Sequence, residues 1–424
     1  MLDIQRIREN TDEVRTGIES KNAPIDTDTI LSLDQERRDI ISEVEALKHE
    51  RNVLSHQVAE LKKSKGDATA LIERTREIGA QIKSLDDKQH KVEEQLDNLL
   101  MQIPNIPHSS VPVGFDASEN PVVKEWGPRY APGFELLTHL EIGAALGLFD
   151  FTRGTKIAGP GFPLYTGSGA RLERALINFM LDFHIEKHGY TEVLPPVVSN
   201  RKTMTTTGQL PKFEEDMYKI PQDDLYLIPT AEVPVTNIHQ NEILAERDLP
   251  IRYCAYSACF RREAGSYGKD TRGFLRLHQF NKVEMVKFTH PDTSYAELET
   301  LRRDAEEILE ALGLEYRVIE LVTGDLSFAA AKCYDLELWA PGEKRWLEVS
   351  SCSNFEDFQA RRGAIRFKPE GGGKAQLLHT LNGSGVATPR LLVALLETYQ
   401  QGDGSVLLPE ILKPYMGTTG LHLK

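Results

Sequence analysis

The chain has 424 residues, 40% of them hydrophobic and 27% charged, with a formal net charge of −14. These proportions are typical of a globular protein, and the length favours two domains over a single core. A protein that spans a membrane by helices is excluded, because the sequence contains no run of about 18 apolar residues. The first residues, MLDIQRIRENTDEVR, are charged throughout and lack the apolar core of a signal peptide, so we expect a cytoplasmic protein.

The spacing of cysteine and histidine argues against disulfide and zinc chemistry. The four cysteines are scattered without a C-x-x-C pair: Cys254, Cys259, Cys333 and Cys352. Neither a disulfide scaffold nor a structural zinc site is therefore indicated. The histidines form no H-E-x-x-H motif, so a zinc hydrolase is not indicated either.

A helical hairpin is predicted from about residue 28 to residue 101, where glycine and proline are nearly absent. Mostly apolar residues recur there at alternating steps of four and three, as in a coiled coil. The first arm carries Leu33, Arg37, Ile40, Val44, Leu47, Arg51, Leu54, Val58 and Leu61, and the second carries Leu71, Thr75, Ile78, Ile82, Leu85, Gln89, Val92, Leu96 and Leu99. We expect Gly66 to turn the chain between the arms. Arms of roughly 35 residues would form a rod on the order of 50 Å long.

The two halves of this hairpin differ in charge. The distal half, residues 48–76, has a net charge of +3, whereas the base, residues 30–47 and 77–103, has a net charge of −6. A positive distal half suits attraction to a phosphate backbone, although ordinary solvated charges on a coiled coil explain it equally well. The basic residues of the distal half are Lys48, Arg51, Lys62, Lys63, Lys65, Arg74 and Arg76.

A proline-rich segment ends the hairpin. Three prolines in IPNIPHSSVP, residues 103–112, cannot continue a helix. We therefore predict an N-terminal domain over 1–103, a linker over 104–113 and a second domain over 114–424. The second domain contains a predicted amphipathic helix from Ala170 to His188, followed by a strand that ends at Pro195 and Pro196.

The stretch FRREAGSYGKDTRGFLRLHQF, residues 260–280, is typical of a strand, a polar loop and a return strand. In an extended strand, Arg261 and Glu263 would point to one side and Arg262 to the other. A guanidinium can grip a phosphate at two points, a carboxylate can accept from an exocyclic amine, and Phe280 offers a ring on which a base can stack. The stretch thus favours a nucleotide site, although Arg-Arg-Glu alone is more often a solvated surface cluster.

A second phrase, LNGSGVATPR, places Gly-Ser-Gly ahead of an apolar helix with Arg390 in its first turn. Glycines allow a ligand to approach the backbone, and Arg390 would add a second fixed charge for a polyphosphate. By itself, however, Gly-Ser-Gly before a helix is usually only a turn.

Acidic and hydroxyl side chains follow these phrases. Glu284 in FNKVEMV lies on the same strand face as Phe280 and Lys282, and a carboxylate there needs a partner, either a substrate or a basic residue of the fold. Thr230 and Glu232 in YLIPTAE offer a hydroxyl and a carboxylate for a small polar substrate.

In RWLEVSSCSN, Glu348 and Ser351 offer oxygen ligands for a hard cation. Residues three apart in a straight strand face opposite ways, so this role requires a bulge or the start of a loop near Ser350.

Together these phrases resemble the class II aminoacyl-tRNA synthetases. FRRE with its closing phenylalanine, and the later G-S-G-x-A-x-x-R, are similar to motifs 2 and 3 of that class. TGQLPKF (207–213), PTAEVP (229–234) and LEVSSCSNFEDFQARR (347–362) narrow the resemblance to the seryl-tRNA synthetases. The resemblance covers essentially the whole chain, including the hairpin.

The resemblance implies an α+β fold, with a long N-terminal antiparallel coiled-coil hairpin and a catalytic domain built on an antiparallel β-sheet flanked by helices. The absence of a strand-linked GxGxxG and of GxxxxGK[ST] agrees with this fold. Residues 170–196 are similar to motif 1, which implies a homodimer, although a helix packed on its own sheet explains the pattern equally well. The hairpin would grip the long variable arm of a tRNA.

The resemblance also implies roles for the site residues. Catalysis would rest on Arg261, Glu348 and Arg390. ATP would be bound by Arg261, Arg262, Glu263, Leu277, Phe280, Glu348, Val349, Ser350, Ser351 and Arg390. Serine would be bound by Thr230, Ala231, Glu232, Arg261, Glu284, Asn382 and Ser384. Mg²⁺ would be held with ATP by Glu348 and Ser351.

The implied reaction is ATP-dependent activation of L-serine and its transfer to the 3′ end of tRNA(Ser), extended by analogy to tRNA(Sec). Alanine lacks the hydroxyl and is expected to leave Glu284 unsatisfied in a dry pocket. Three other functions compete: a class II ligase for another amino acid, a ligase that loads a carrier protein, and a structural coiled-coil protein with a degenerate catalytic body. A different amino acid is disfavoured by the Thr-Ala-Glu phrase together with Glu284. A carrier-protein ligase is disfavoured by the intact hairpin, and a degenerate catalytic body by the complete set of site residues.

Overall fold

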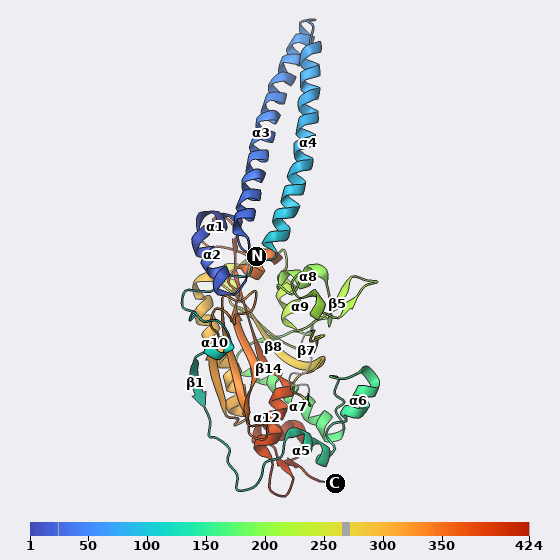
Figure 1. Ribbon diagram of the computed structural model, residues 1–424, viewed down its shortest axis with the longest axis vertical. Coiled ribbons are helices and arrows are strands. Elements are labelled where there is room, and N and C mark those ends of the chain that lie inside the picture. The colour runs from blue at the N-terminus through green and yellow to red at the C-terminus, as the bar shows by residue number, and fades with distance from the viewer. Residues whose placement is uncertain (24, 265–271, 424) are drawn as a thin grey trace. The chain divides into compact units, whose positions relative to one another are not determined.

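The computed structural model describes residues 1–23, 25–264 and 272–423 (Figure 1). The chain forms two compact units, Met1–Pro104 and Asn105–Lys424. Among the helices described, none combines the length and the apolar composition that crossing a membrane would need.

The N-terminal unit is the predicted helical hairpin. Its arms are α3 (Thr27–Lys63) and α4 (Thr69–Leu100), which lie side by side in Figure 1. The buried seam between them consists of Ile40, Val44, Ile78, Ile82 and Val92, with Leu33, Leu47, Leu54 and Leu85 partly buried against it. The predicted heptad core is therefore confirmed.

Two short helices, α1 (Ile4–Glu9) and α2 (Thr11–Ser20), precede the hairpin. The fully buried carboxylate of Asp34 in α3 accepts hydrogen bonds from Arg8, Arg37 and Arg38. Burial opposes ionisation of Asp34, but these arginines outweigh it and lower the pKa of that carboxyl. The charged partners fix α1 against α3.

The turn between the arms differs from the prediction in one detail. Lys65, rather than Gly66, takes the left-handed conformation, with φ of 56°. The backbone N–H of Gly66 donates to the carbonyl of Leu61 at 2.8 Å and that of Lys65 to Lys62 at 3.3 Å, which is a Schellman closure of α3. Gly66 matters instead for fit, because a Cβ atom there would lie 3.1 Å from Leu61 Cδ2.

The C-terminal unit is built on an eight-stranded sheet in the order β1-β9-β10-β11-β14-β8-β7-β2. All neighbouring strands are antiparallel except β2 and β7, so the predicted antiparallel sheet is confirmed. The strands are β1 (Val122–Trp126), β2 (Thr191–Glu192), β7 (Ile251–Phe260), β8 (Gln279–Thr289), β9 (Tyr316–Glu320), β10 (Lys332–Ala340), β11 (Arg345–Asn354) and β14 (His379–Ala387).

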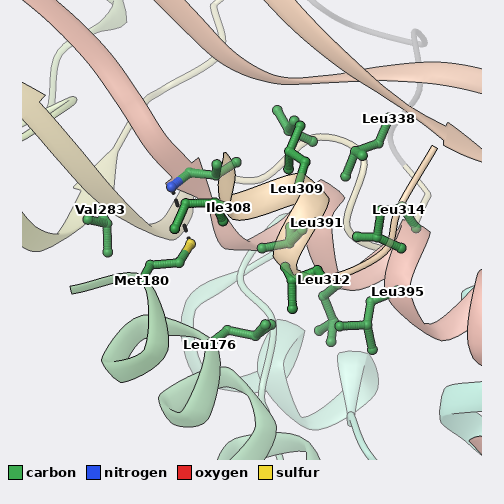
Figure 2. Close-up of a cluster of buried hydrophobic side chains, with 14 of the residues drawn as sticks. Leu176, Met180, Val283, Ile308, Leu309, Leu312, Leu314, Leu338, Leu391 and Leu395 are labelled. Atoms are coloured by element: carbon green, nitrogen blue, oxygen red, sulfur yellow. Dashed lines mark hydrogen bonds between the residues drawn. The ribbon is translucent and has the colours of Figure 1, made fainter. Parts of the chain in front are cut away.

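Three long helices pack on this sheet: α7 (Gly167–Glu186), α10 (Ser294–Ala311) and α12 (Thr388–Tyr399). Figure 2 shows their shared core, in which the labelled side chains include Leu176 and Met180 of α7, Ile308 and Leu309 of α10, and Leu391 and Leu395 of α12. The helix predicted from Ala170 to His188 is α7. Its apolar face is buried within its own unit, so the periodicity has a sufficient explanation there.

Shorter elements complete the unit. The helices are α5 (His139–Leu146), α6 (Phe151–Ala158), α8 (Arg201–Thr206), α9 (Glu232–Thr236), α11 (Phe358–Gly363) and α13 (Lys413–Met416). The remaining strands form three small sheets: β3 (Val198–Asn200), β5 (Leu225–Leu227) and β4 (Lys219–Ile220); β13 (Gln376–Leu377), β12 (Arg366–Lys368) and β6 (Ile243–Ala245); and β15 (Val406–Leu407) with β16 (Gly420–Leu421).

Two of the irregularities in this sheet lie on the neighbouring strands β11 and β14. Between β10 and β11, Leu336 pairs with Ser350 but Glu337 pairs with Glu348, so Val349 is an extra residue in β11. This is the bulge near Ser350 that the sequence required. Between β14 and β8 the register shifts after the pair of Ser384 and Glu284. A bulge redirects side chains, and here both shifts lie where the sheet carries its polar residues.

Candidate active site

A cleft of about 640 Å³ lies in the C-terminal unit, lined in part by β8, β11 and β14. It brings together residues that are up to 183 positions apart in the sequence, from Thr207 to Arg390. The sequence-predicted site residues that line it are Thr230, Glu232, Arg261, Glu263, Leu277, Phe280, Glu284, Glu348, Val349, Ser350, Ser351, Asn382, Ser384 and Arg390.

Two predicted residues are not brought into the cleft. Arg262 points away, and its guanidinium donates to the carbonyl of Glu215 at 3.2 Å. Ala231 is fully buried in the core. Neither side chain is therefore placed to contact a ligand in the cleft.

Arg261 and Glu263 do not lie on an extended strand, so the predicted strand alternation is not what places them together. Strand β7 ends at Phe260, and Glu263 has φ of 52°, in the left-handed region that an extended strand never uses. Arg261 is held instead by its backbone N–H, which donates to His278 at 2.9 Å. Both side chains nevertheless line the cleft. The polar loop predicted between the two strands falls mostly on residues 265–271, which lie outside the described residues.

The glycines of LNGSGVATPR, residues 381–390, have a different role from the one predicted. Gly383 and Gly385 lie inside strand β14 rather than in a loop before the helix. A Cβ atom on Gly385 would lie 2.3 Å from His184 Nε2, and one on Gly383 would lie 2.9 Å from Cys352 Sγ. These glycines therefore allow packing behind the sheet, while Asn382 and Ser384 face the cleft.

One end of the cleft is organised around Glu284, whose side chain is only 1% exposed. It forms an ion pair with Lys282 and accepts hydrogen bonds from Thr230 Oγ1 at 3.0 Å and Asn382 Nδ2 at 3.2 Å. Of the two partners that the sequence left open, a basic residue of the fold is thus present. Lys282 was not among the predicted site residues, although its place on the strand face was clear.

A second buried carboxylate, Glu232, lies in the same end. Gln359 Nε2 donates to Glu232 Oε1 at 2.7 Å, and Thr380 Oγ1 donates in turn to Gln359 Oε1 at 2.8 Å. Burial, together with the charge of Glu284, raises the pKa of Glu232 to about 7. This end can accept a cationic or hydrogen-bond-donating group.

The other end of the cleft is cationic. The guanidinium of Arg261 lies 5.1 Å from the centre of the Phe280 ring. Arg390, in the first turn of α12, donates to the carbonyl of Glu348 at 2.9 Å and to that of Leu275 at 3.3 Å. Arg261 Nε donates to the carbonyl of Pro229 at 3.4 Å. Two guanidiniums held by backbone carbonyls are suited to bind phosphate groups.

Oxygen ligands for a hard cation lie beside Arg390. The Glu348 carboxylate is 3.6 Å from Arg390 and about half exposed, and Ser351 follows the bulge. Asp335, which pairs with Ser351 across the sheet, is a further carboxyl that the sequence did not reveal. Burial and the neighbouring charge of Glu348 hold the pKa of Asp335 well above its usual range. The carboxylate and hydroxyl donors fit a magnesium ion.

Within the described ranges, one other group of side chains has metal-ligand spacing: His139, Glu343 and Glu397, whose ligand atoms lie within 4.8 Å of one another. The Glu397 carboxylate is already occupied, because it accepts from the backbone N–H groups of His139, Gly342 and Glu343 at 2.9 to 3.0 Å. His139 Nδ1 lies 3.2 Å from the same carboxylate. This group is a structural link between α5 and α12.

The predicted RNA-contacting residues lie along the distal half of the hairpin. Lys48, Lys62, Lys63, Lys65 and Arg76 are exposed, and Arg51 is half-buried. Arg74 differs, because it pairs with Glu50 of the opposite arm at 3.0 Å and with Glu77 at 3.4 Å. Arg74 therefore links the two arms through its ion pair with Glu50.

Comparisons with known proteins agree over the whole chain. Residues 1–107 match the seryl-tRNA synthetase N-terminal domain, and residues 213–399 match the class II tRNA synthetase core domain for G, H, P, S and T. The serine–tRNA ligase of Geobacter sulfurreducens is 53% identical over 417 residues, which are 98% of this chain and 99% of that relative.

Two solved structures are similar throughout. Seryl-tRNA synthetase from Pyrococcus horikoshii, complexed with ATP, has a TM-score of 0.94 and 37% identity and covers 100% of both chains. The cytoplasmic serine–tRNA ligase of Naegleria fowleri, in complex with AMP, has a TM-score of 0.89 and 32% identity, with coverage of 100% of this chain and 99% of that one.

The pairing of Lys282 with Glu284 predicts an asymmetric response to mutation. Replacing Lys282 by Met leaves a buried carboxylate without its counter-charge and is expected to lower the free energy of unfolding by about 3–5 kcal/mol. The double variant K282M/E284Q removes both charges and is expected to recover most of that loss. Urea unfolding of the wild type, both single variants and the double variant measures the coupling. Additive effects in this cycle would contradict the ion pair.

Proposed function

Because the chain belongs to the seryl-tRNA synthetase family and is a serine–tRNA ligase, we propose that its cleft holds ATP and L-serine side by side and joins them as seryl adenylate. Serine then passes to the 3′ end of a tRNA. The observation that carries this proposal is the division of one cleft into a cationic end at Arg261 and Arg390 and an acidic end at Glu232 and Glu284. A triphosphate and an amino acid need these two ends.

ATP takes the cationic end. Phe280 stacks on the adenine ring, and Glu263 accepts a hydrogen bond from the adenine amine, while Leu277 adds an apolar contact. Arg261 contacts the α-phosphate and Arg390 a distal phosphate. In support, Glu263 is held by Arg276 at 3.0 Å, so its carboxylate has a fixed place at this end of the cleft.

Serine takes the acidic end. Glu232 receives the ammonium group, and Glu284, with Thr230, Asn382 and Ser384 around it, receives the hydroxyl. The serine carboxylate then points toward Arg261, between the two ends. Arg262 and Ala231 have no direct part in this scheme, because neither lines the cleft.

The first step is an in-line displacement. A serine carboxylate oxygen attacks the α-phosphorus of ATP, the new C–O–P linkage forms, and the bond to the β-phosphate oxygen breaks to release pyrophosphate. The carboxylate is already ionised at neutral pH, so the step needs no general base. Arg261 and Arg390 hold the reacting groups in line and offset the charge that develops on the phosphate oxygens.

Mg²⁺ would be held by Glu348 and Ser351, with Asp335 close behind. When bound with ATP it supplies charge neutralisation of the phosphates. The backbone of Val349 and Ser350 lies between these two ligands, and the bulge at Val349 supports the assignment because it brings Glu348 and Ser351 to one side of the strand.

The hairpin is proposed to bind the long variable arm of tRNA(Ser) through its exposed basic residues. We extend this to tRNA(Sec), which also has a long extra arm, and failure to charge such a transcript in vitro would remove the extension. We further propose a cytoplasmic homodimer that uses α7 and the segment to Pro196. The exposed Leu194, at 80%, supports that interface, and a monomeric mass in sedimentation would contradict it.

Pyrophosphate exchange tests the proposed function directly. Purified protein with Mg²⁺ and ATP is expected to incorporate labelled pyrophosphate into ATP with serine, and not with the other nineteen amino acids. Exchange with a different amino acid would reassign Thr230, Glu232 and Glu284 to that substrate. No exchange with any amino acid would contradict the catalytic assignment of the cleft.

The elevated pKa of Glu232 predicts a pH dependence of serine binding. With a pKa of about 7, Glu232 is largely neutral at pH 6 and ionised at pH 8, and only the ionised form attracts the serine ammonium. The KM for serine is therefore expected to be about tenfold higher at pH 6 than at pH 8. E232Q should raise KM and abolish this pH dependence, while the KM for ATP serves as the internal control. An unchanged pH profile in E232Q would assign the dependence to another group.

If the hairpin binds tRNA, serine activation and tRNA charging should depend on different units of the chain. Deleting residues 23–101 and splicing the ends is expected to leave serine-dependent pyrophosphate exchange intact while abolishing the charging of tRNA(Ser). The same preparation serves both assays, so exchange is the control for folding of the remaining unit. Loss of both activities would mean that the hairpin is required for folding rather than for RNA binding alone.

A further inference from the structure

Strand β14 loses its regular partners where it reaches the acidic end of the cleft. Its ladder with β11 ends at Gly383. Its ladder with β8 continues to Ser384 and resumes at Ala387, with one residue more on β14 than on β8. In the described part of the chain, the backbone of Gly385 and Val386 therefore lies outside both ladders. Both residues are buried, so their polar backbone groups need other partners.

Two side chains of helix α7 supply these partners. Met180 Sδ accepts from the backbone N–H of Val386 at 3.2 Å, a bond drawn as a dashed line at Met180 in Figure 2. His184 Nε2 lies 2.8 Å from the carbonyl oxygen of Gly385. Because a carbonyl can only accept, His184 Nε2 carries the hydrogen and donates it. Helix α7 thus takes the place of a sheet partner at the bulge of β14.

The other nitrogen of His184 determines the tautomer that this bond needs. His184 is fully buried, and burial lowers its pKa to about 3, so the ring is neutral and Nδ1 carries no hydrogen. His188 Nδ1 lies 3.0 Å from His184 Nδ1 and is therefore the donor. In the other tautomer, the bare Nε2 of His184 would face the Gly385 carbonyl, and two acceptors would be in contact. His188 thereby selects the tautomer that donates to β14.

His188 is oriented in turn by helix α10. Its Nε2 lies 3.3 Å from Glu307 Oε2 and 3.9 Å from Asp304 Oδ1. A hydrogen bond from Lys187 lowers the pKa of Glu307 to about 2, so this carboxylate is ionised and accepts. The chain of hydrogen bonds therefore runs from α10 through two histidines to the backbone of β14.

This chain ends directly behind a residue that is proposed to bind serine. Ser384 precedes Gly385 and lines the cleft, and its own carbonyl accepts from Ser350 Oγ at 2.5 Å. Its partner across the ladder is Glu284, the buried carboxylate of the acidic end. Because consecutive residues share a rigid peptide plane, a shift of the Gly385 carbonyl would also move Ser384.

The start of α12, which carries Arg390, is fixed separately. Thr388 Oγ1 donates to the carbonyl of Asn281 at 3.1 Å and to the carboxylate of Glu173. These contacts hold Arg390 in place without the help of Gly385. A disturbance at Gly385 is therefore expected to affect the acidic end of the cleft and not the cationic end.

We propose that His184 is a positioning residue for serine: the hydrogen that its Nε2 donates to the Gly385 carbonyl holds Ser384 in place, and His188 keeps that hydrogen on Nε2. Neither histidine lines the cleft, so both act through the backbone of β14. A role in packing alone would depend on the size of the rings and not on which nitrogen donates. The inference rests on the proposed function, because it presupposes that Ser384 contacts serine.

Two substitutions of His184 separate donation from packing. In His184→Asn the amide reaches only the position of Nδ1, so the bond to Gly385 is lost. In His184→Gln the amide nitrogen reaches the position of Nε2 and can still donate. In serine-dependent pyrophosphate exchange, the KM for serine is expected to be about tenfold higher in H184N and close to the wild-type value in H184Q. The KM for ATP should be unchanged in both.

The matched control is His379→Asn, at the start of the same strand, where His379 Nδ1 bonds to Ser294 Oγ at 2.8 Å. This variant should leave both KM values unchanged. An equal KM for serine in H184N and H184Q, or a KM for ATP that rises as much as that for serine, would overturn the proposal. Absence of serine-dependent exchange in the wild type would instead refute the proposed function.

Urea unfolding shows whether each variant folds. If H184N does not fold, a second pair at His188 decides. His188→Leu removes the donor to His184 Nδ1 and is expected to raise the KM for serine about threefold, whereas His188→Asn, whose amide can donate there, should keep the wild-type value. Equal KM values for serine in H188L and H188N would also overturn the proposal.

Discussion

The arrangement of the cleft depends on the buried carboxylate of Glu284, which the sheet can hold only if neighbouring groups balance its charge. Glu284 lies on β8, in the interior of the eight-stranded sheet, and is almost fully buried. An unpaired carboxylate there would cost several kcal/mol, so its neighbours are constrained in type and position. Lys282 supplies the counter-charge, and Thr230 and Asn382 supply hydrogen bonds. Three separate segments are thereby fixed around one carboxylate.

This constraint also sets the state of Glu232. Lys282 already pairs with Glu284, so Glu232 accepts from a neutral amide, that of Gln359, and the charges of Lys282 and Arg261 only partly offset its burial. Its elevated pKa is the result, and a substrate ammonium is the group that would complete the charge balance. At the opposite end Arg261 donates to the carbonyl of Pro229 and Arg390 donates to the carbonyl of Glu348, whose half-exposed carboxylate also pairs with Arg390 at 3.6 Å. The two ends of the cleft therefore attract opposite charges before any ligand binds.

The sequence predicted the structure correctly where regular spacing of residues along a helix or strand determines which side chains share a face. The heptad seam of α3 and α4 and the shared face of Phe280, Lys282 and Glu284 follow from spacing and side-chain alternation alone, whereas the bulge near Ser350 was expected only because the family resemblance gave Glu348 and Ser351 one role. It failed where a long-range contact decides. The sequence gives no sign that β7 ends at Phe260, that Gly385 packs on His184, or that Gln359 holds Glu232, because each depends on a segment far away in the chain.

The internal pairing of Glu284 changes the expected basis of serine selection. The sequence suggested that alanine would leave this carboxylate unsatisfied, but Lys282, Thr230 and Asn382 already satisfy it. Alanine therefore forfeits only the hydrogen bonds that the serine hydroxyl would form, at about 1 kcal/mol for each neutral bond and about 1.5–3 kcal/mol for one to a charged group. Strong discrimination then requires that serine binding displaces one of these donors, for example by moving Thr230. Alanine cannot displace this donor, so the cleft would not close around alanine. Alanine would then be rejected because the closed site does not form, rather than because a buried charge is left unpaired.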